Sequence, residues 1–228
     1  GIARHFGMET PEYLEKSRAI HEFIATKTAG AVDMPDVRFM KTKIRQGEAR
    51  TACNYIGVKP ENVHFLNLPF YETGTIKKGD LTEKDVAIVR KLIEEVKPHQ
   101  IFVAGDLADP HGTHKVCTDA VLAAIDELKD EPWMTDCRIW MYRGAWAEWE
   151  IDHIEMAVPI SPEELRFKRN SILKHQSQME NAPFLGDDDR LFWQRAEERN
   201  RATARLYQDL GLASYEAIEA FVEYHPIR

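Results

Sequence analysis

Short apolar runs alternate with helical patterns along most of this chain, and this order constrains the fold more than any other feature. The apolar runs typical of strands cover residues 62–69, 99–105, 137–144 and 153–161. Apolar residues three and four apart indicate helices over residues 11–25, 37–56, 82–96 and 113–128. Strands joined by crossover helices form a parallel sheet. We therefore predict an α/β fold, a Rossmann-like three-layer sandwich with a mostly parallel sheet.

Residues 99–105 are apolar on both faces, which predicts a strand in the centre of its sheet. The last part of the chain has the periodicity of helices, near residues 189–210 and 214–224. A helix should begin after Ser161, because Ser is a good N-cap, Pro162 suits the first helical position and two acids follow. We expect a single domain over residues 1–228, with helical segments at 1–35 and 161–228.

Composition excludes several classes of partner. The 228 residues carry a net charge of −8, without the basic stripe that a nucleic-acid groove requires, so we expect neither nucleic acid nor an anionic membrane as a partner. The three cysteines are widely spaced and form no C-x-x-C pair, which fits a reducing, cytoplasmic setting. No apolar run reaches the length of a membrane span.

The turn after residues 99–105 collects polar side chains, namely Asp106, Asp109, His111 and His114. Ligands bind beyond the carboxyl ends of strands in open parallel sheets, so this turn is a candidate site. If a helix begins near Thr113, its dipole favours neutral imidazole at His114, the form that binds metals. Asp109 could instead cap the helix, and a catalytic zinc usually takes three protein ligands, so the turn alone does not establish a metal site.

Three segments in order resemble one family. "ADPHGTHKVC" resembles the His-Pro-Asp-His motif of the PIG-L/LmbE family of zinc-dependent N-deacetylases. "IRQGEARTACNYIGVKPENVHFLNLP" is similar to the family's Arg-rich helix and the strand that follows it. "FKRNSILKHQSQ" is similar to its C-terminal Lys-Arg-x-x-Ile-x-x-His-x-Ser-Gln. The resemblance spans roughly residues 40–180 and is strongest to the domain carried by some bacterial glucosamine-6-phosphate deaminase-like proteins.

This resemblance implies removal of an acetyl group from an N-acetylated amino sugar, with zinc as cofactor. His114 would be a zinc ligand and His111 would stabilise the oxyanion of the intermediate, with Asp109 as a further catalytic candidate. The substrate-binding candidates are Tyr71, Glu72, Arg143 and His175, and Trp146 and Trp149 could stack on a sugar ring. A solvated loop at Glu72, a structural His175 and a packing role for at least one tryptophan remain alternatives. A deaminase-like domain would be a partner in the parent polypeptide.

Two departures from the family pattern weaken the enzymatic interpretation. Thr113 stands where the family has Asp, and the family's first motif, His-Pro-Asp-Asp, is absent, since the only His-Pro pair is His225-Pro226. That motif would supply two metal ligands and the general base. We therefore expect an N-terminally truncated domain that lacks two strands, and that by itself binds zinc weakly and hydrolyses little. Its exposed sheet edge should pair with another copy, giving a homo-oligomer, or be covered by the N-terminal helix.

Three functions therefore remain open at this point. The first is a zinc-dependent deacetylase completed by residues outside the chain. The second is a non-catalytic structural or sugar-binding domain of a deaminase-like protein. A nucleotide-binding Rossmann domain is the weakest, because the chain has neither a G-x-G-x-x-G nor a Walker sequence.

Overall fold

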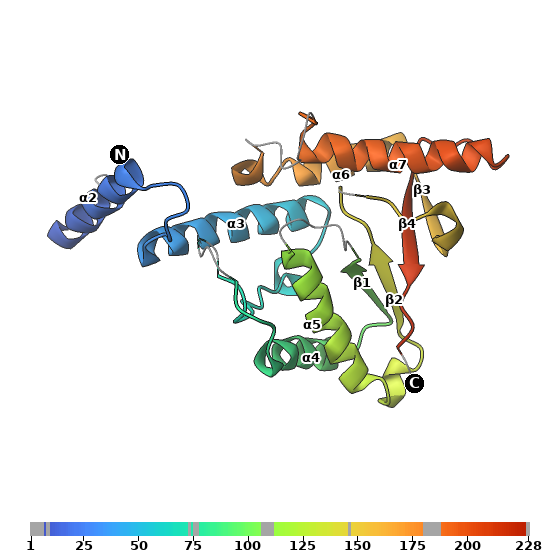
Figure 1. The fold of residues 1–228 in the computed structure, drawn as a ribbon, viewed down its shortest axis with the longest axis horizontal. Coiled ribbons are helices and arrows are strands. Elements are labelled where there is room, and N and C mark those ends of the chain that lie inside the picture. The colour runs from blue at the N-terminus through green and yellow to red at the C-terminus, as the bar shows by residue number, and fades with distance from the viewer. Residues whose placement is uncertain are drawn as a thin grey trace.

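The fold combines helices and strands in one chain (Figure 1). The structure, a computed structural model, describes residues 7, 10–72, 74, 78–105, 112–145, 147–179 and 188–226. The helices in these ranges are α2 (Pro11–Thr26), α3 (Pro35–Tyr55), α4 (Glu83–Val96), α5 (Thr113–Leu128), α6 (Pro162–Ile172) and α7 (Phe192–Asp209). The strands are β1 (Gln100–Ala104), β2 (Arg138–Tyr142), β3 (Met156–Ile160) and β4 (Ala217–Glu223).

The sheet has four strands in the order β1-β2-β4-β3. β1 and β2 are parallel, with Gln100 opposite Arg138, whereas β4 runs antiparallel to both β2 and β3. The mixed α/β class is confirmed. The described strands do not form the mostly parallel sheet that we predicted, because the strand that follows α7 enters between β2 and β3 in the opposite direction.

Three local predictions differ from the structure. Residues 63–69 belong to no described strand, and residues 60–62 form a turn of 3₁₀ helix. The predicted helix over 214–224 is wrong, since residues 217–223 form β4, whose short apolar run suits a buried strand as well as a helix. β1 was predicted to be central, but in the described part of the chain it is paired with β2 alone.

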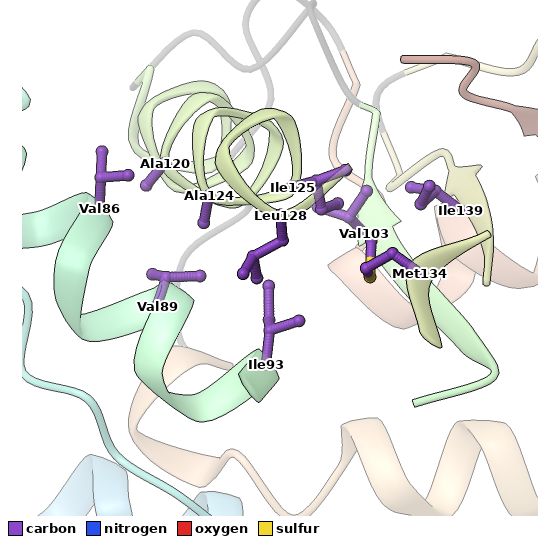
Figure 2. Packing of buried hydrophobic residues seen from close by; sticks show 10 residues of the cluster. All are labelled: Val86, Val89, Ile93, Val103, Ala120, Ala124, Ile125, Leu128, Met134 and Ile139. Carbon is purple, nitrogen blue, oxygen red and sulfur yellow. The ribbon is translucent and has the colours of Figure 1, made fainter. Parts of the chain in front are cut away.

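The main core lies between the sheet and the pair α4 and α5. Figure 2 shows Val86 and Val89 of α4 near Ala120 and Ala124 of α5 and Ile93 next to Leu128, while Val103 of β1 belongs to the same cluster. Ala120 and Ala124 are fully buried, and their small side chains let the two helices approach closely. Successive strand residues point to opposite faces, so Phe102 points away from this core, towards α6 and α7. The sheet is therefore covered on both faces.

Local signals explain where the helices begin. Ser161 and Glu164 form the predicted capping box, with the Ser161 Oγ accepting from the Glu164 amide at 3.2 Å. Thr10 caps α2 in the same manner, accepting from the Tyr13 amide. No residue of α2 is buried, and Figure 1 shows this helix lying apart from the sheet. Among the described residues, no helix combines the length and the apolar character needed to cross a membrane.

Candidate functional site

The polar turn predicted to carry the chemistry leads from the end of β1 into α5. α5 begins at Thr113, as predicted, after Gly112 with a left-handed φ of 66°. His114 is exposed in the first turn of this helix. The Thr118 hydroxyl donates to the carbonyl of Ala104, which fixes α5 against the end of β1. His114 is thereby held near the carboxyl end of a strand, where ligands bind in α/β sheets.

The other residues of the predicted turn lie outside the described residues. These are Asp106, Asp109 and His111. Among the described residues, no three His, Cys, Asp or Glu side chains are close enough together to hold a metal ion. His114 by itself does not fit a zinc site, which needs three protein ligands and an open position.

A large hollow brings together three of the predicted substrate-binding residues. We call it the central hollow; its volume is about 1130 Å³ and it is bounded by α3, residues 64–72, α4, β1, α5 and residues near 175. Tyr71, Glu72 and His175 all line it. Most of the remaining lining is apolar, with Leu66 and Ile101 among the contributors. The hollow therefore combines these polar side chains with a mainly apolar lining.

Asp85 fixes the segment that carries Tyr71 and Glu72. Its fully buried carboxylate accepts from the Phe70 amide at 2.9 Å, and from both the amide and the hydroxyl of Thr82 at 2.9 and 2.6 Å. Burial raises the pKa of Asp85, but these hydrogen bonds outweigh burial and hold the pKa below its ordinary value. Asp85 thus caps the start of α4 and also binds the backbone at Phe70, directly before Tyr71 and Glu72.

Two arginines of α3 contact Tyr71 and Glu72. The Arg45 guanidinium donates to the Tyr71 hydroxyl at 3.4 Å. The Arg38 Nε lies 3.2 Å from a carboxylate oxygen of Glu72, which is itself exposed. Glu72 therefore has an ionic partner on α3.

His175 is positioned by a link between two of the family-like segments. The Glu48 carboxylate of α3 accepts from both the amide and the hydroxyl of Ser177, each at 2.6 Å. Asn170 of α6 also donates to the Tyr55 hydroxyl at 3.0 Å. His175 is half-buried between these contacts. Glu48 lies within one of the family-like segments, but the sequence does not indicate this role. Only the fold brings Glu48 beside Ser177.

Arg143 lies in a different place from the other substrate-binding candidates. Its guanidinium stacks on Trp149, with Cζ 3.9 Å from the ring centroid. The indole of Trp149 donates to the Met141 carbonyl, and a Cβ added to Gly105 would come within 2.8 Å of its ring. Trp149 is therefore a packing residue, while Trp146 lies outside the described residues. Arg143 lines a separate pocket of about 350 Å³ between the sheet and α6 and α7.

A cluster of charged side chains, missed by sequence reasoning, supports that second pocket. The Arg199 guanidinium, 8% exposed, bridges Glu148 and Glu219, and Lys168 donates to Glu219 and Asn200. Burial raises the pKa of Glu148 and lowers the pKa of Lys168. These residues come from four distant segments, so the sequence contains no local signal for the cluster.

Comparisons with known proteins agree on one family. The model of the GlcNAc-PI de-N-acetylase (PIG-L) family matches residues 6–125. A Bacteroides thetaiotaomicron protein described as glucosamine-6-phosphate deaminase-like is 68% identical over 215 residues, covering 93% of this chain and 32% of that protein. The chain thus spans about a third of the length of this curated relative.

Solved structures show that the fold is shared. The conserved protein TT1542 from Thermus thermophilus has a TM-score of 0.53 at 17% identity, covering 87% of this chain and 78% of its own. A triple mutant of a deacetylase involved in the teicoplanin biosynthetic pathway has a TM-score of 0.52 at 18% identity, covering 85% of this chain and 81% of its own. At these identities the likeness concerns the fold alone.

Proposed function

Because the chain belongs to the GlcNAc-PI de-N-acetylase (PIG-L) family, we propose that it forms one part of a hydrolase that removes the acetyl group from an N-acetylated amino sugar. The observation that carries this proposal is the family match over residues 6–125, which includes the turn between β1 and α5. The position of His114 at the carboxyl end of a parallel strand supports it. We treat residues 1–228 as a single deacetylase-like domain with a Rossmann-like arrangement.

In this proposal one set of residues carries the metal and the chemistry, and another set binds the substrate. His114 acts as a metal ligand, and His111 and Asp109 are the catalytic candidates beside it. Tyr71, Glu72 and His175 bind the sugar in the central hollow, whereas Arg143, which lines the separate pocket between the sheet and α6 and α7, is proposed to bind a phosphate group there. Tyr71, Glu72 and His175 line one hollow, which supports a shared role in binding the sugar.

We propose zinc as the cofactor, held by His114 together with ligands from outside the described residues. The described residues do not fit a zinc site, since His114 belongs to no group of three possible metal ligands among them. We propose that the 228-residue chain by itself binds zinc weakly and hydrolyses little. No catalytic step through the metal is therefore derived from these residues.

The test is metal content and hydrolysis in the longer polypeptide, with flanking sequence present. We expect about one zinc per chain and release of acetate from N-acetylglucosamine or its 6-phosphate, both lost in His114→Ala. His99→Ala is the matched control, because His99 is also exposed but precedes β1 at the opposite end of the strand. A longer polypeptide that holds no zinc and cleaves neither sugar would exclude the enzymatic function.

A second function follows from the curated relative. That protein is described as deaminase-like, and this chain matches 32% of it, so the domain could serve as a non-catalytic structural or sugar-binding part of such a protein. In that case N-acetylglucosamine 6-phosphate would bind without being cleaved. Calorimetry with this sugar, together with the acetate assay, separates the two functions. Binding that is lost in His175→Ala, with no hydrolysis in any form of the protein, supports the second.

A further inference from the structure

Arg143 lies beside the start of the connection that leads to His114, because β1 and β2 are parallel and leave the sheet at the same end. Ala104 is opposite Tyr142 in their register, and the Gly105 amide donates to the Tyr142 carbonyl at 2.7 Å. Gly105 and Arg143 are therefore the next residues along the two strands. Arg143 thus borders the carboxyl ends of the parallel strands, where ligands bind in α/β sheets.

The indole of Trp149 provides the surface on which the Arg143 guanidinium lies. The Arg143 Cζ is 3.9 Å from the centroid of the ring. The ring itself sits closely over the end of β1, since a Cβ added to Gly105 would come within 2.8 Å of the indole and within 2.9 Å of the Met141 Cβ. The absence of a side chain at residue 105 therefore makes room for the ring that carries Arg143.

Hydrogen bonds fix Trp149 through both its side chain and its backbone. The indole Nε1 donates to the Met141 carbonyl at 3.2 Å. The Trp149 amide donates to one carboxylate oxygen of Glu148 at 2.9 Å, and the other oxygen accepts from the Arg199 Nη1 at 2.7 Å. The charged cluster around Arg199 therefore extends to Trp149, and through its ring to Arg143.

The pocket of about 350 Å³ that Arg143 lines has the chemistry of a site for an anion on a ring. Among its described lining residues, Arg143, Lys168 and Arg199 are cationic and Glu219 is a carboxylate. The cations still outnumber the carboxylates when Glu148, which binds Arg199, is included. A guanidinium binds a phosphate through paired hydrogen bonds, and aromatic faces pack against sugar rings. The pocket offers four such aromatic rings, those of Phe102, Tyr142, Phe192 and Phe221.

Resting on the proposed function, in which Arg143 binds a phosphate group, we propose that Trp149 is a positioning residue that orients Arg143 and thereby makes the protein select a phosphorylated N-acetyl amino sugar over the neutral sugar. Stacking leaves the guanidinium few orientations, so less freedom is lost when the phosphate binds. A lysine at residue 143 would keep the charge but would neither stack as a plane nor bind in two places. Selection should therefore depend on the guanidinium and on the ring beneath it.

Binding of two sugars to the longer polypeptide, with flanking sequence present, tests this selection. Calorimetry gives the dissociation constants of N-acetylglucosamine and of its 6-phosphate, and their ratio measures the selection. We expect a ratio of about 100 in the wild type, about 10 in Trp149→Leu and near 1 in Arg143→Met, with unchanged affinity for the neutral sugar. Arg138→Met is the matched control and should keep the wild-type ratio. Arg138 belongs to the same strand and lies over Trp140, with Cζ 5.9 Å from the ring centroid, but at the opposite end of β2.

Two conservative variants separate positioning from packing. Trp149→Phe keeps a ring under the guanidinium and should retain most of the ratio, whereas Arg143→Lys keeps only the charge and should lose about tenfold. An equal loss of affinity for both sugars in Trp149→Leu would overturn the positioning role. An undiminished ratio in Arg143→Lys would overturn it as well, and this variant decides the question if Trp149→Leu does not fold.

Acetate release distinguishes a failure of this selection from a failure of the proposed function. Hydrolysis of both sugars with equal kcat/KM and equal affinity would overturn the selection and leave the deacetylase function standing. Tighter binding of the 6-phosphate through Arg143, without any acetate release, would support the selection and exclude hydrolysis. Binding of neither sugar would overturn the selection.

Discussion

Asp85 shows how one residue serves both the fold and the candidate site. Its carboxylate belongs to the capping box at the start of α4 and also accepts from the Phe70 amide. One side chain therefore binds both the helix and the loop that carries Tyr71 and Glu72. The helix predicted over residues 82–96 is present as α4, but the contact of Asp85 with Phe70 spans 15 residues and depends on the fold. A buried donor left without a partner is costly, which makes this residue a sensitive test.

We expect Asp85→Ala to destabilise the protein by roughly 3 kcal/mol, from two unsatisfied amides and a lost cap. Chemical denaturation at pH 7 measures this. The pKa of Asp85 is lowered in the folded state, so its contribution is present above pH ~4 and is lost as pH falls through the folded pKa. The stability difference between wild type and Asp85→Asn should therefore shrink below pH ~4. A difference that does not change with pH would contradict this assignment.

His114 should behave in the opposite way. It is exposed on the first turn of α5, so His114→Ala should change the free energy of unfolding by no more than about 0.5 kcal/mol. Any loss of zinc or activity in the longer polypeptide would then be a site effect. A loss of several kcal/mol in a denaturation experiment would instead assign the histidine to packing.

At the scale of elements, β4 organises the C-terminal part of the fold. It lies between β2 and β3, and its Glu219 binds Lys168 of α6 and Arg199 of α7. Burial raises the pKa of Glu219, but the two cations outweigh it and hold the pKa below its ordinary value. One carboxylate therefore joins a strand to two helices.

Glu219→Ala should cost about 3 kcal/mol, because it leaves two largely buried cations without their shared partner. Thermal or urea denaturation measures the loss. Glu163→Ala is the control: its ion pair with Arg166 is exposed, and we expect a change within about 0.5 kcal/mol. Equal effects of the two substitutions would show that the Glu219 cluster does not stabilise the fold.

At the scale of the whole molecule, α2 packs separately from the described residues that follow it, from Lys27 onward, which we call the body. α2 buries no residue, whereas residues from Lys27 onward interact with the rest, beginning with the Lys27 ion pair to buried Asp33. The central hollow lies in the body. The stability of the body should therefore depend little on α2.

Deletion of residues 1–26 should change the free energy of unfolding by less than about 1 kcal/mol, since none of the described residues in this range is buried. Urea denaturation of the shortened and the complete chain measures this, and the denaturant slope should fall only slightly. A loss of several kcal/mol would mean that α2 packs against the body in solution.

The sequence by itself determined most of the helices and the family. Caps and apolar periodicity act within a few residues, so the starts of α5 and α6 and the buried face of α5 were predicted correctly. The family resemblance was confirmed by the family match over residues 6–125, which covers two of the three similar segments. Local chemistry was sufficient in these cases because a helix forms its hydrogen bonds within its own segment.

Only the tertiary structure decided how the strands pair, which segments besides β1, β2 and β3 form strands, and which side chains meet. A strand needs a partner from elsewhere in the chain, so residues 63–69 were predicted as a strand without forming one, and residues 217–223 formed one unexpectedly. For the same reason, Tyr71 and His175 share a hollow while Arg143 lines another pocket. Hydrogen bonds and packing between distant segments set these positions, and the order of residues along the chain does not specify them.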